Sequence, residues 1–466
     1  MKSENISSSS IADISGCLRD RTLTSVRLTQ HCIEQHEKYG EHLNAYISWD
    51  PEAALACARE ADELFRDQRV MNELQGIPIS VKDIYGLPGH PVFAGSKKKL
   101  PEKFNEPGAL ISSLISFNSV FMGKTHTVEF AYGGLGINNN WGTPWNPWDK
   151  KNHRCPGGSS SGAGISLNEG SALVALGTDT AGSVRLPASF TGNVGLKTTS
   201  GRWSTEGIVP LSPSFDTAGI LTRTADDASH VFVAIDRGRL SFKEHDELIR
   251  TIGALQCQEF KIAMPDGFMW ESTESSIAEV CKDAVDALAK DGCDVVDEDF
   301  PEAQMAIVLR DEGATASVEL IEFLQSELPE WIDDLDPVIR DRIQIGGDID
   351  AIEYLRRLRK FRNLQESTHK RFHEYDLIVS PTVPLSPPLV SEVSEPEDYM
   401  EKNLLALQNT GVCSFLNLPA VTVPVGLDSN GMPVGLQLMG TPKSEIMLLA
   451  AAQKLESLIE KPVLQR

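Results

Sequence analysis

The chain is most informative in two short runs, Cys155-Pro-Gly-Gly-Ser-Ser-Ser-Gly-Ala-Gly164 and Gly177-Thr-Asp-Thr-Ala-Gly-Ser-Val-Arg185. Small residues dominate both runs, and glycine lets a backbone adopt positive φ angles and approach a ligand closely. Successive backbone N–H groups in such turns form a concave site for negative charge. Apolar, helix-like sequence follows soon after the first run, which is unlike a flexible linker. We therefore expect both runs to belong to a functional site.

Two familiar motifs are matched only superficially. Gly158-Ser-Ser-Ser-Gly162 fits the G-x-S-x-G nucleophile elbow of α/β-hydrolases, with Ser160 as the serine. That elbow needs a buried strand directly before it, and His153-Arg-Cys-Pro156 does not have the pattern of a strand. Gly123-Lys-Thr125 resembles the end of a P-loop, but the first glycine of that motif would fall at Asn118.

The composition limits the class of protein. The chain has 466 residues, of which 41% are hydrophobic and 23% are charged, as in an ordinary globular protein. Its 43 Lys and Arg residues against 66 Asp and Glu residues give a formal net charge of −23. Contact with a phosphate backbone needs clustered Lys and Arg, so we expect no nucleic-acid partner. The acid excess is explained by solubility.

Cysteine usage and the chain start indicate the compartment. The eight cysteines are scattered without any C-x-x-C pair, which is typical of reduced, mostly buried thiols in a cytoplasmic protein. Met1–Ser10 is polar and lacks the apolar core of a secretory signal. The longest apolar run, Ile446–Ala452, is far shorter than the roughly 20 residues of a membrane span. We expect a soluble, cytoplasmic protein with no membrane partner. The cysteines are Cys17, Cys32, Cys57, Cys155, Cys257, Cys281, Cys293 and Cys413.

Hydrophobic periodicity predicts alternating helices and strands. This alternation is typical of an α/β fold with a central sheet. We expect one large domain over residues 1–466, in which an N-terminal helical segment, residues 1–65, packs on the core formed by residues 66–466. The predicted helices lie near residues 24–33, 51–61, 110–114, 276–288, 303–375 and 445–458, and the predicted strands near residues 76–81, 120–122, 260–264, 293–296, 377–379 and 420–424.

The stretch from Tyr132 to Gly164 shows little periodicity and is rich in Gly, Asn and Ser. A long irregular segment in a compact domain is usually functional or disordered. Three tryptophans inside it, Trp141, Trp145 and Trp148, favour an ordered segment.

Several motifs occur in a fixed order along nearly the whole chain, and together they resemble the amidase signature family. Gly76-Ile-Pro-Ile-Ser-Val-Lys-Asp83 is similar to the lysine strand of that family. The two runs quoted above, followed by Gly192-Asn-Val-Gly-Leu-Lys-Thr198, resemble its signature block. Leu418–Gly426 and Gly431–Gln437 resemble its C-terminal strands. The resemblance implies a single large α/β domain with a mixed sheet flanked by helices.

The resemblance also implies a catalytic triad. Ser183 corresponds to the nucleophile, Ser159 to a bridging serine beside a cis peptide bond, and Lys82 to the base. Serine is a weak nucleophile and needs a base that takes its proton. An ammonium group cannot accept a proton, so Lys82 must be neutral, which burial favours. A hydroxyl both donates and accepts, so Ser159 can relay the proton.

Stabilisation of the tetrahedral intermediate requires hydrogen-bond donors aimed at its oxyanion. The resemblance places the backbone N–H groups of Thr180, Ala181, Gly182 and Ser183 in this oxyanion hole. The family often has two glycines before the nucleophile, and this chain has Ala181-Gly182 instead.

Three further residues are expected to support the loop. Asp179 and Arg185 flank it, and the resemblance implies that they form an ion pair. Ser160 is expected to hold the loop by hydrogen bonding and to do no chemistry.

The histidines near these motifs, His90, His126 and His153, show neither a Ser-His-Asp order nor the spacing of metal ligands. We therefore expect no metal and no cofactor.

The substrate is the least determined part. Relatives line the acyl pocket at the positions of Tyr132, Gly133 and Ile137, and Trp141 is expected in its wall. Arg310-Asp-Glu-Gly313 lies where some relatives with small ureido substrates place a carboxylate-binding arginine. Asp311 and Glu312 in this stretch favour a neutral or cationic substrate instead.

The resulting hypothesis is an amidohydrolase that cleaves a C–N bond in a small linear carboxamide or urea-type compound, other than a peptide bond, through a Ser183 acyl-enzyme. It would release ammonia or an amine. One alternative is the ammonia-supplying component of a glutamyl-tRNA(Gln) amidotransferase, which works with a partner enzyme. A second is a non-catalytic scaffold, which the intact Lys82, Ser159 and Ser183 disfavour. Relatives are often homodimers, and a homodimer is one expected assembly.

Overall fold

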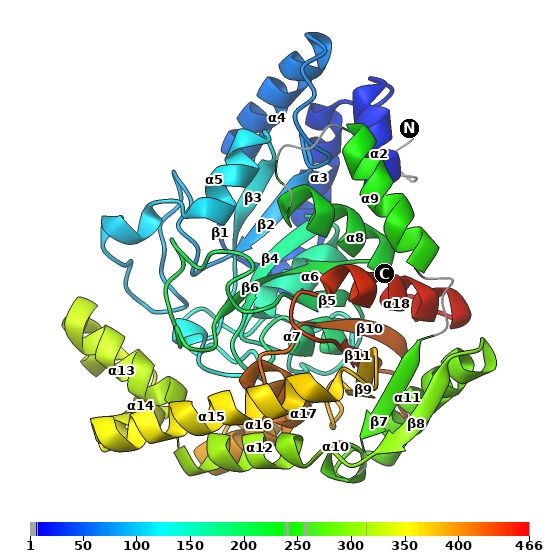
Figure 1. Ribbon diagram of the computed structural model, residues 1–466. Helices are drawn as coiled ribbons and strands as arrows, with labels where there is room; N and C mark the ends of the chain where they lie inside the picture. Colours follow the sequence, from blue (N-terminus) through cyan, green and yellow to red (C-terminus); the bar gives the residue numbers. More distant parts are fainter. Residues whose placement is uncertain are drawn as a thin grey trace.

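A mixed β-sheet runs through the whole molecule, and a computed structural model describes it over residues 6, 8–236, 238, 242–255, 260–265, 267–313 and 315–465. The described strands follow the order β1-β3-β2-β4-β6-β5-β10-β11-β9-β7-β8 (Figure 1). Their bounds are β1 Tyr46–Trp49, β2 Pro78–Lys82, β3 Val120–Thr125, β4 Val174–Asp179, β5 Val194–Lys197, β6 Thr217–Thr222, β7 Lys261–Pro265, β8 Asp294–Glu298, β9 Leu377–Pro381, β10 Ala420–Leu427 and β11 Pro433–Met439.

The sheet is parallel on both sides of an antiparallel centre. Strands β3, β2 and β4 are parallel neighbours, and so are β9, β7 and β8. The strands between these groups, β6, β5, β10 and β11, pair antiparallel. Strand β1 closes the N-terminal edge antiparallel to β3. The α/β class and the mixed sheet expected from the sequence are therefore confirmed.

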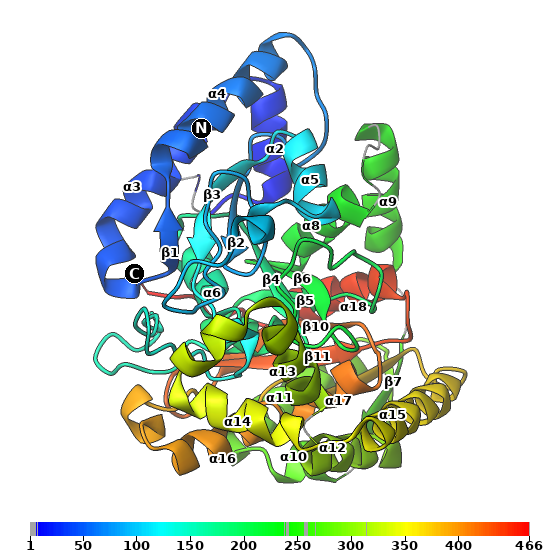
Figure 2. The same ribbon diagram turned by 90° about the vertical axis from the view of Figure 1, so that its left-hand side faces the viewer.

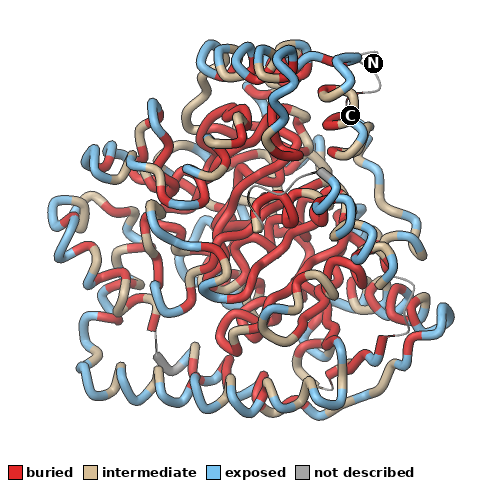
Figure 3. Tube along the Cα trace, turned by 45° about the horizontal axis from the view of Figure 1, so that its top comes forward, coloured by how far each residue is buried: buried red, intermediate tan, exposed pale blue. Residues whose placement is uncertain are grey.

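Helices cover both faces of the sheet, and the alternation of side chains along β4 explains why. Val174 and Leu176 point into the main apolar core together with residues of α8 and α18. Ala175, one residue out of phase, packs with Ala163 of α6 and Ala188 of α7 in a smaller cluster. Successive residues of a strand point to opposite faces, so the two helix layers lie on opposite sides. Figure 3 shows the buried sheet inside the exposed helical shell.

The described helices are α2 Ile11–Arg19, α3 Ser25–Leu43, α4 Pro51–Arg66, α5 Ala109–Ser116, α6 Ser161–Glu169, α7 Arg185–Thr191, α8 Ala225–Asp236, α9 Phe242–Leu255, α10 Phe268–Glu271, α11 Ser275–Lys290, α12 Pro301–Gly313, α13 Thr315–Glu327, α14 Pro337–Gly347, α15 Ala351–Arg371, α16 Pro396–Ala406, α17 Gln408–Phe415 and α18 Glu445–Leu458. Short 3-10 turns occupy Glu102–Asn105, Glu129–Ala131, Pro329–Asp334 and Val390–Val393.

The elements predicted from periodicity are present at the expected places. The Thr24 hydroxyl accepts a hydrogen bond from the Arg27 N–H and caps α3, and Pro51 begins α4 after its cap Asp50. Residues 303–375 are largely helical, as predicted. The three tryptophans of the irregular segment each donate an indole hydrogen bond to a backbone carbonyl, so this segment is held in place.

Five helices, α12–α16, gather at one side of the molecule and are called the helical lobe below (Figures 1 and 2). Helix α13 packs on α14, and α12 packs on α15. No helix in the described ranges is both long and apolar enough to cross a membrane. The described cysteines are unpaired, and five of the seven are buried, whereas Cys257 lies outside the described residues.

Candidate active site

The sheet brings the two glycine-rich runs beside the predicted lysine. Strands β2 and β4 are parallel neighbours, with Val81 paired to Leu176. Strand β2 ends at Lys82 and β4 ends at Asp179, so the two strand ends share one edge of the sheet. The first run lies in the loop before α6, and the second connects β4 to α7.

Lys82 is fully buried and makes two short hydrogen bonds. Its Nζ donates to Ser159 Oγ at 2.7 Å and to Thr178 Oγ1 at 2.8 Å. Burial lowers the pKa of Lys82 to about 7, although the charges of Asp216 and Asp179 oppose this shift. The amine is therefore largely neutral just above neutral pH and can then act as a proton acceptor.

The loop around Ser159 is fixed by backbone contacts. The Gly158–Ser159 peptide bond is cis. The Gly158 N–H donates to the Gly134 carbonyl at 2.6 Å, and the Ser159 carbonyl accepts from the Val128 N–H at 3.1 Å. These contacts hold the Ser159 hydroxyl against the lysine.

Ser183 lies on the connection that follows β4 and is 5% exposed. Its carbonyl accepts a hydrogen bond from the Ser160 N–H at 3.3 Å, which ties the two runs together. No described residue forms a hydrogen bond with its Oγ. The preceding Gly182 has a φ of 137°, and a Cβ there would lie 2.1 Å from Thr410 Oγ1, so only glycine fits.

The four backbone N–H groups expected in the oxyanion hole differ in their engagement. The N–H of Gly182 donates to Asp179 Oδ1 at 2.8 Å. Those of Thr180, Ala181 and Ser183 donate to none of the residues that the structure describes. Three donors are therefore free to face a developing negative charge.

Asp179 and Arg185 form a fully buried ion pair with two contacts, at 2.9 and 3.0 Å. Burial alone would raise the pKa of Asp179, but the Arg185 guanidinium outweighs it and holds the pKa below its usual value. Arg185 also donates to Gln437 Oε1 and to the Thr410 carbonyl, so the pair links β4, α7, β11 and α17.

Ser160 contacts the strand that holds the lysine partner. Its Oγ donates to the Thr178 carbonyl at 3.4 Å, and the Thr178 N–H donates back at 3.4 Å. These contacts are weak, but they fix the position of the loop beside β4.

A cavity of about 470 Å³ adjoins the centre at Ala181, next to Ser183. Every helix of the lobe contributes to its wall, and Tyr132 forms part of the opposite side. The lobe contributes Arg310, Ser317, Arg342, Arg357 and Leu404, one from each helix in order.

Positive charge lies inside this cavity and negative charge at its rim. The side chains of Arg310 and Arg357 are 13% and 14% exposed, and each pairs with a neighbouring carboxylate. The carboxylate beside Arg310 is Asp311, which is 47% exposed. Arg342 has no carboxylate partner among the described residues. The cavity wall therefore offers one unpaired guanidinium to a ligand.

Tyr132 and Arg342 are in direct contact. The guanidinium stacks on the Tyr132 ring with 3.9 Å to the ring centre, and its Nη1 donates to the Tyr132 carbonyl at 2.7 Å. The Tyr132 hydroxyl is hydrogen-bonded to Ser317 Oγ. The irregular segment and the lobe thus meet at the cavity.

The other residues expected in the pocket are dispersed. Gly133 packs against the Tyr399 hydroxyl, and Trp141 packs against Phe93. Ile137 lines a separate cavity of about 190 Å³. The side chain of Glu312 lies outside the described part of the structure.

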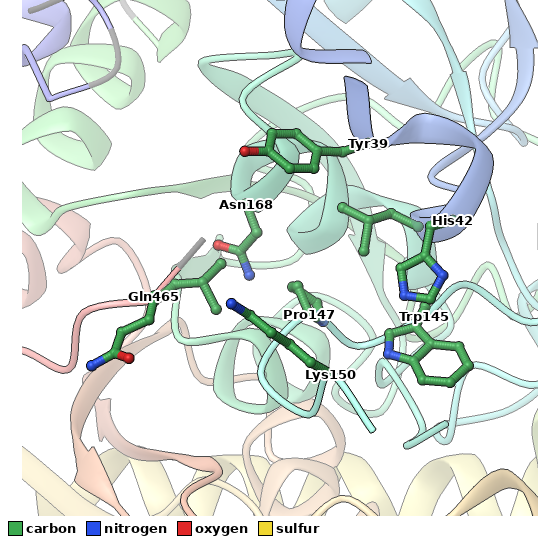
Figure 4. Close-up of a pocket in the computed structure, with 9 residues that line it drawn as sticks. Tyr39, His42, Trp145, Pro147, Lys150, Asn168 and Gln465 are labelled. Carbon is green, nitrogen blue, oxygen red and sulfur yellow. The ribbon is translucent and has the colours of Figure 1, made fainter. Parts of the chain in front are cut away.

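A further cavity of about 270 Å³ lies between α3 and the C-terminal residues (Figure 4). Tyr39, His42 and Trp145 line it together with Gln465. Its lining contains none of the predicted site residues.

Two contacts of the centre were missed by sequence reasoning. Thr178, which accepts from Lys82, is a single threonine in a strand and carries no distinct signal. The Asp216 carboxylate accepts from Thr180 Oγ1 at 2.5 Å and from the Leu211 and Ser212 N–H groups at 2.9 Å. It lies well beyond the quoted runs in the chain.

Comparison with known proteins identifies the class. A family model described as Amidase matches residues 27–449, so the chain belongs to the amidase family. It is 44% identical over 450 residues to 2-amino-5-chloromuconic acid deaminase from Comamonas testosteroni, covering 97% of this chain and 96% of that protein. It is 31% identical to the first component of the glutamyl-tRNA(Gln) amidotransferase from Chloroflexus aggregans, over 92% of this chain and 91% of that protein.

A solved structure agrees with this result. The crystal structure of a peptide amidase in complex with the competitive inhibitor chymostatin matches with a TM-score of 0.81 and 25% identity, over 96% of this chain and 97% of that chain. The protein is a hydrolase of the amidase type that acts on C–N bonds.

Proposed function

We propose that the protein hydrolyses a C–N bond in a small linear substrate that carries a carboxylate, and that it releases ammonia. Ser183 is the nucleophile, Ser159 relays its proton and Lys82 receives it. The observation that carries this proposal is the buried Lys82, whose Nζ lies 2.7 Å from Ser159 Oγ. A lysine with a pKa of about 7 can accept and return a proton at neutral pH.

The steps for an amide balance as follows. Ser183 Oγ attacks the carbonyl carbon while its proton passes through Ser159 to Lys82. The negative charge moves to the carbonyl oxygen, where the N–H groups of Thr180, Ala181 and Ser183 stabilise it. Lys82 returns the proton through Ser159 to the leaving nitrogen, and ammonia departs as the C–N bond breaks. Water then attacks the acyl-enzyme with the same relay as base, which releases the acid and restores Ser183.

The charge of the cavity favours an acidic substrate. Arg342 is half-buried, lies in the cavity wall and lacks a carboxylate partner among the described residues. A guanidinium is the preferred partner of a carboxylate, because it can donate two parallel hydrogen bonds. Asp311 pairs with Arg310 at the rim, so its charge is already compensated. We therefore propose the opposite preference to the neutral or cationic one expected from Asp311 and Glu312.

The Comamonas relative bears on the substrate class. Its name describes the deamination of an amino-substituted muconic acid, a six-carbon unsaturated dicarboxylic acid. We propose a 2-amino unsaturated dicarboxylic acid as the favoured substrate of this protein. Such a compound and an amide share an sp² carbon bound to nitrogen. In the imine tautomer, addition of water at this carbon and loss of ammonia give the oxo acid, so the balance is one water consumed for one ammonia released.

The amidotransferase component remains the second candidate. The chain is 31% identical to a protein of that kind, against 44% for the deaminase, at similar coverage. Such a component would need a companion protein, whereas the proposed enzyme would turn over alone.

The test is ammonia release by the purified chain from a panel of four compounds. The panel contains 2-aminomuconic acid, a primary amide bearing a distal carboxylate, the methyl ester of that amide, and urea. We expect turnover of the acidic compounds, at least tenfold slower reaction of the ester, and none with Ser183→Ala. Preference for the ester or for urea would contradict the acidic substrate. Turnover by Ser183→Ala would contradict the mechanism.

We also propose a cytoplasmic location and a homodimeric assembly. The unpaired cysteines support a reducing compartment. Size-exclusion chromatography with light scattering would test the assembly, and a monomer would contradict it.

A further inference from the structure

Three side chains that can bind a metal ion meet outside the catalytic centre. Glu73 lies on the segment between α4 and β2, His230 lies on α8, and His245 lies on α9. The carboxylate oxygen and the two ring nitrogens lie within 4.8 Å of one another. None of the three takes part in the proposed reaction. The spacing rules that excluded a metal in the sequence could not detect them, because the three residues come from separate elements.

The distances suit a small divalent cation. His230 Nδ1 and His245 Nε2 are 3.2 Å apart, and His230 Nδ1 is 3.9 Å from Glu73 Oε1. In a tetrahedral zinc site the bonds are about 2.0–2.1 Å long, which places neighbouring ligand atoms about 3.3 Å apart. The edge between the histidines therefore already fits, and the glutamate edge needs to close by about 0.5 Å.

The surroundings resemble those of a built site. Glu73 is 3% exposed and His230 is 12% exposed, so water is mostly excluded. Arg19 donates to Glu73 Oε2 at 3.0 Å, which leaves Oε1 facing the histidines. Ligating carboxylates are commonly held by such an outer hydrogen bond. The charge of Asp226 acts on His230, and that of Asp246 acts on His245, so two further carboxylates offset Arg19.

We propose that Glu73, His230 and His245 form a structural site for Zn²⁺, with water completing the coordination. The ion would join the segment before β2, the strand that ends at Lys82, to helices α8 and α9. This segment already contacts α8, because Asn72 Nδ2 donates to the Ala234 carbonyl at 3.0 Å. Zinc binding by the folded chain then stabilises it against unfolding.

The test measures zinc binding directly and does not use activity. The full chain is freed of metal with dipicolinic acid and titrated with Zn²⁺ against a chromophoric chelator. We expect one equivalent with a Kd below about 1 μM, a value within reach of a three-ligand protein site. His230→Gln and His245→Gln should weaken binding at least 100-fold, and Glu73→Gln at least tenfold. His373→Gln, at an exposed histidine after α15, is the matched control and should bind like the wild type.

A second probe keeps the proposal falsifiable if the variants do not fold. Co²⁺ added to the metal-free wild-type chain should give the strong visible absorption of a four-coordinate ion, which one equivalent of Zn²⁺ removes. A weak, six-coordinate spectrum would overturn the proposal. So would the absence of a tight equivalent of Zn²⁺, or equal binding by the ligand variants. Those results would mean that the two rings only share a hydrogen bond.

Discussion

The catalytic centre and the helical lobe solve different problems with charged side chains. In the centre, Lys82, Asp179 and Arg185 are fully buried at the ends of β2 and β4. In the lobe, the cavity arginines are half-buried, and apolar residues such as Ile345 and Leu355 are 58% and 61% exposed. The first region excludes water, whereas the second lies next to it.

This difference separates chemistry from recognition. A neutral lysine exists near pH 7 only where burial disfavours its charge, so the base must lie inside the sheet. A cavity that admits a charged substrate needs guanidinium groups that are accessible from water. Changes in the centre should therefore abolish reaction or folding, and changes in the lobe should alter affinity.

The largest effect is expected for Ser183→Ala. Removal of a nucleophile that acts with its base as a unit lowers kcat by about 10⁵–10⁶-fold. Ser183 makes no side-chain hydrogen bond with a described residue, so the melting temperature should stay within about 2 °C of the wild-type value. Ammonia release and differential scanning calorimetry measure the two quantities. A large loss of stability would mean that the serine is structural.

A smaller but still large effect is expected for Arg185→Gln. Breaking a buried ion pair costs about 3–5 kcal/mol, because the remaining carboxylate of Asp179 is left uncompensated. Lys402→Gln, which removes a partly exposed pair with Glu392 in the lobe, should cost less than about 1 kcal/mol. Urea unfolding gives both values. Similar values for the two variants would remove the contrast between the regions.

The pH dependence of the wild type should report Lys82. The base is active when neutral, and burial lowers its pKa to about 7. The value of kcat/KM should therefore rise with pH and level off above pH 7, and at pH 5 it should be about 100-fold lower, because each pH unit below the pKa costs tenfold. Circular dichroism at pH 5 controls for unfolding. A flat profile between pH 5 and 8 would exclude this lysine as the base.

The smallest effect is expected in the lobe. Arg342→Gln should raise KM for the acidic substrate about 10–100-fold, as loss of a charge-assisted hydrogen bond of about 1.5–3 kcal/mol implies. The KM of the methyl ester and the pH profile should change little. Equal losses for the acid and the ester would mean that Arg342 only positions Tyr132.

The centre was largely predictable from the sequence because its chemistry is encoded in short runs. Lys82 ends an apolar, β-branched segment, and Ser159 and Ser183 lie in glycine-rich runs that fold beside it. Backbone geometry at such positions depends on neighbouring residues, so motif and structure coincide.

The cavity could not be predicted in the same way. The basic residues of 303–375 look like a solvated helix face, and Arg342 faces the cavity only because α14 packs over Tyr132. The same holds for Glu73, His230 and His245, which meet through the packing of α8 and α9. These contacts depend on the placement of whole helices, which no local pattern records.

Covalent labelling with phenylmethylsulfonyl fluoride tests the central claim most directly. This reagent sulfonylates a serine whose proton a neighbouring base removes. Mass spectrometry of the intact chain and its peptides should find one adduct, on Ser183, in step with the loss of activity, and labelling of Lys82→Met should be at least 100-fold slower. An adduct on a different serine, or full activity in chains labelled at Ser183, would contradict the account.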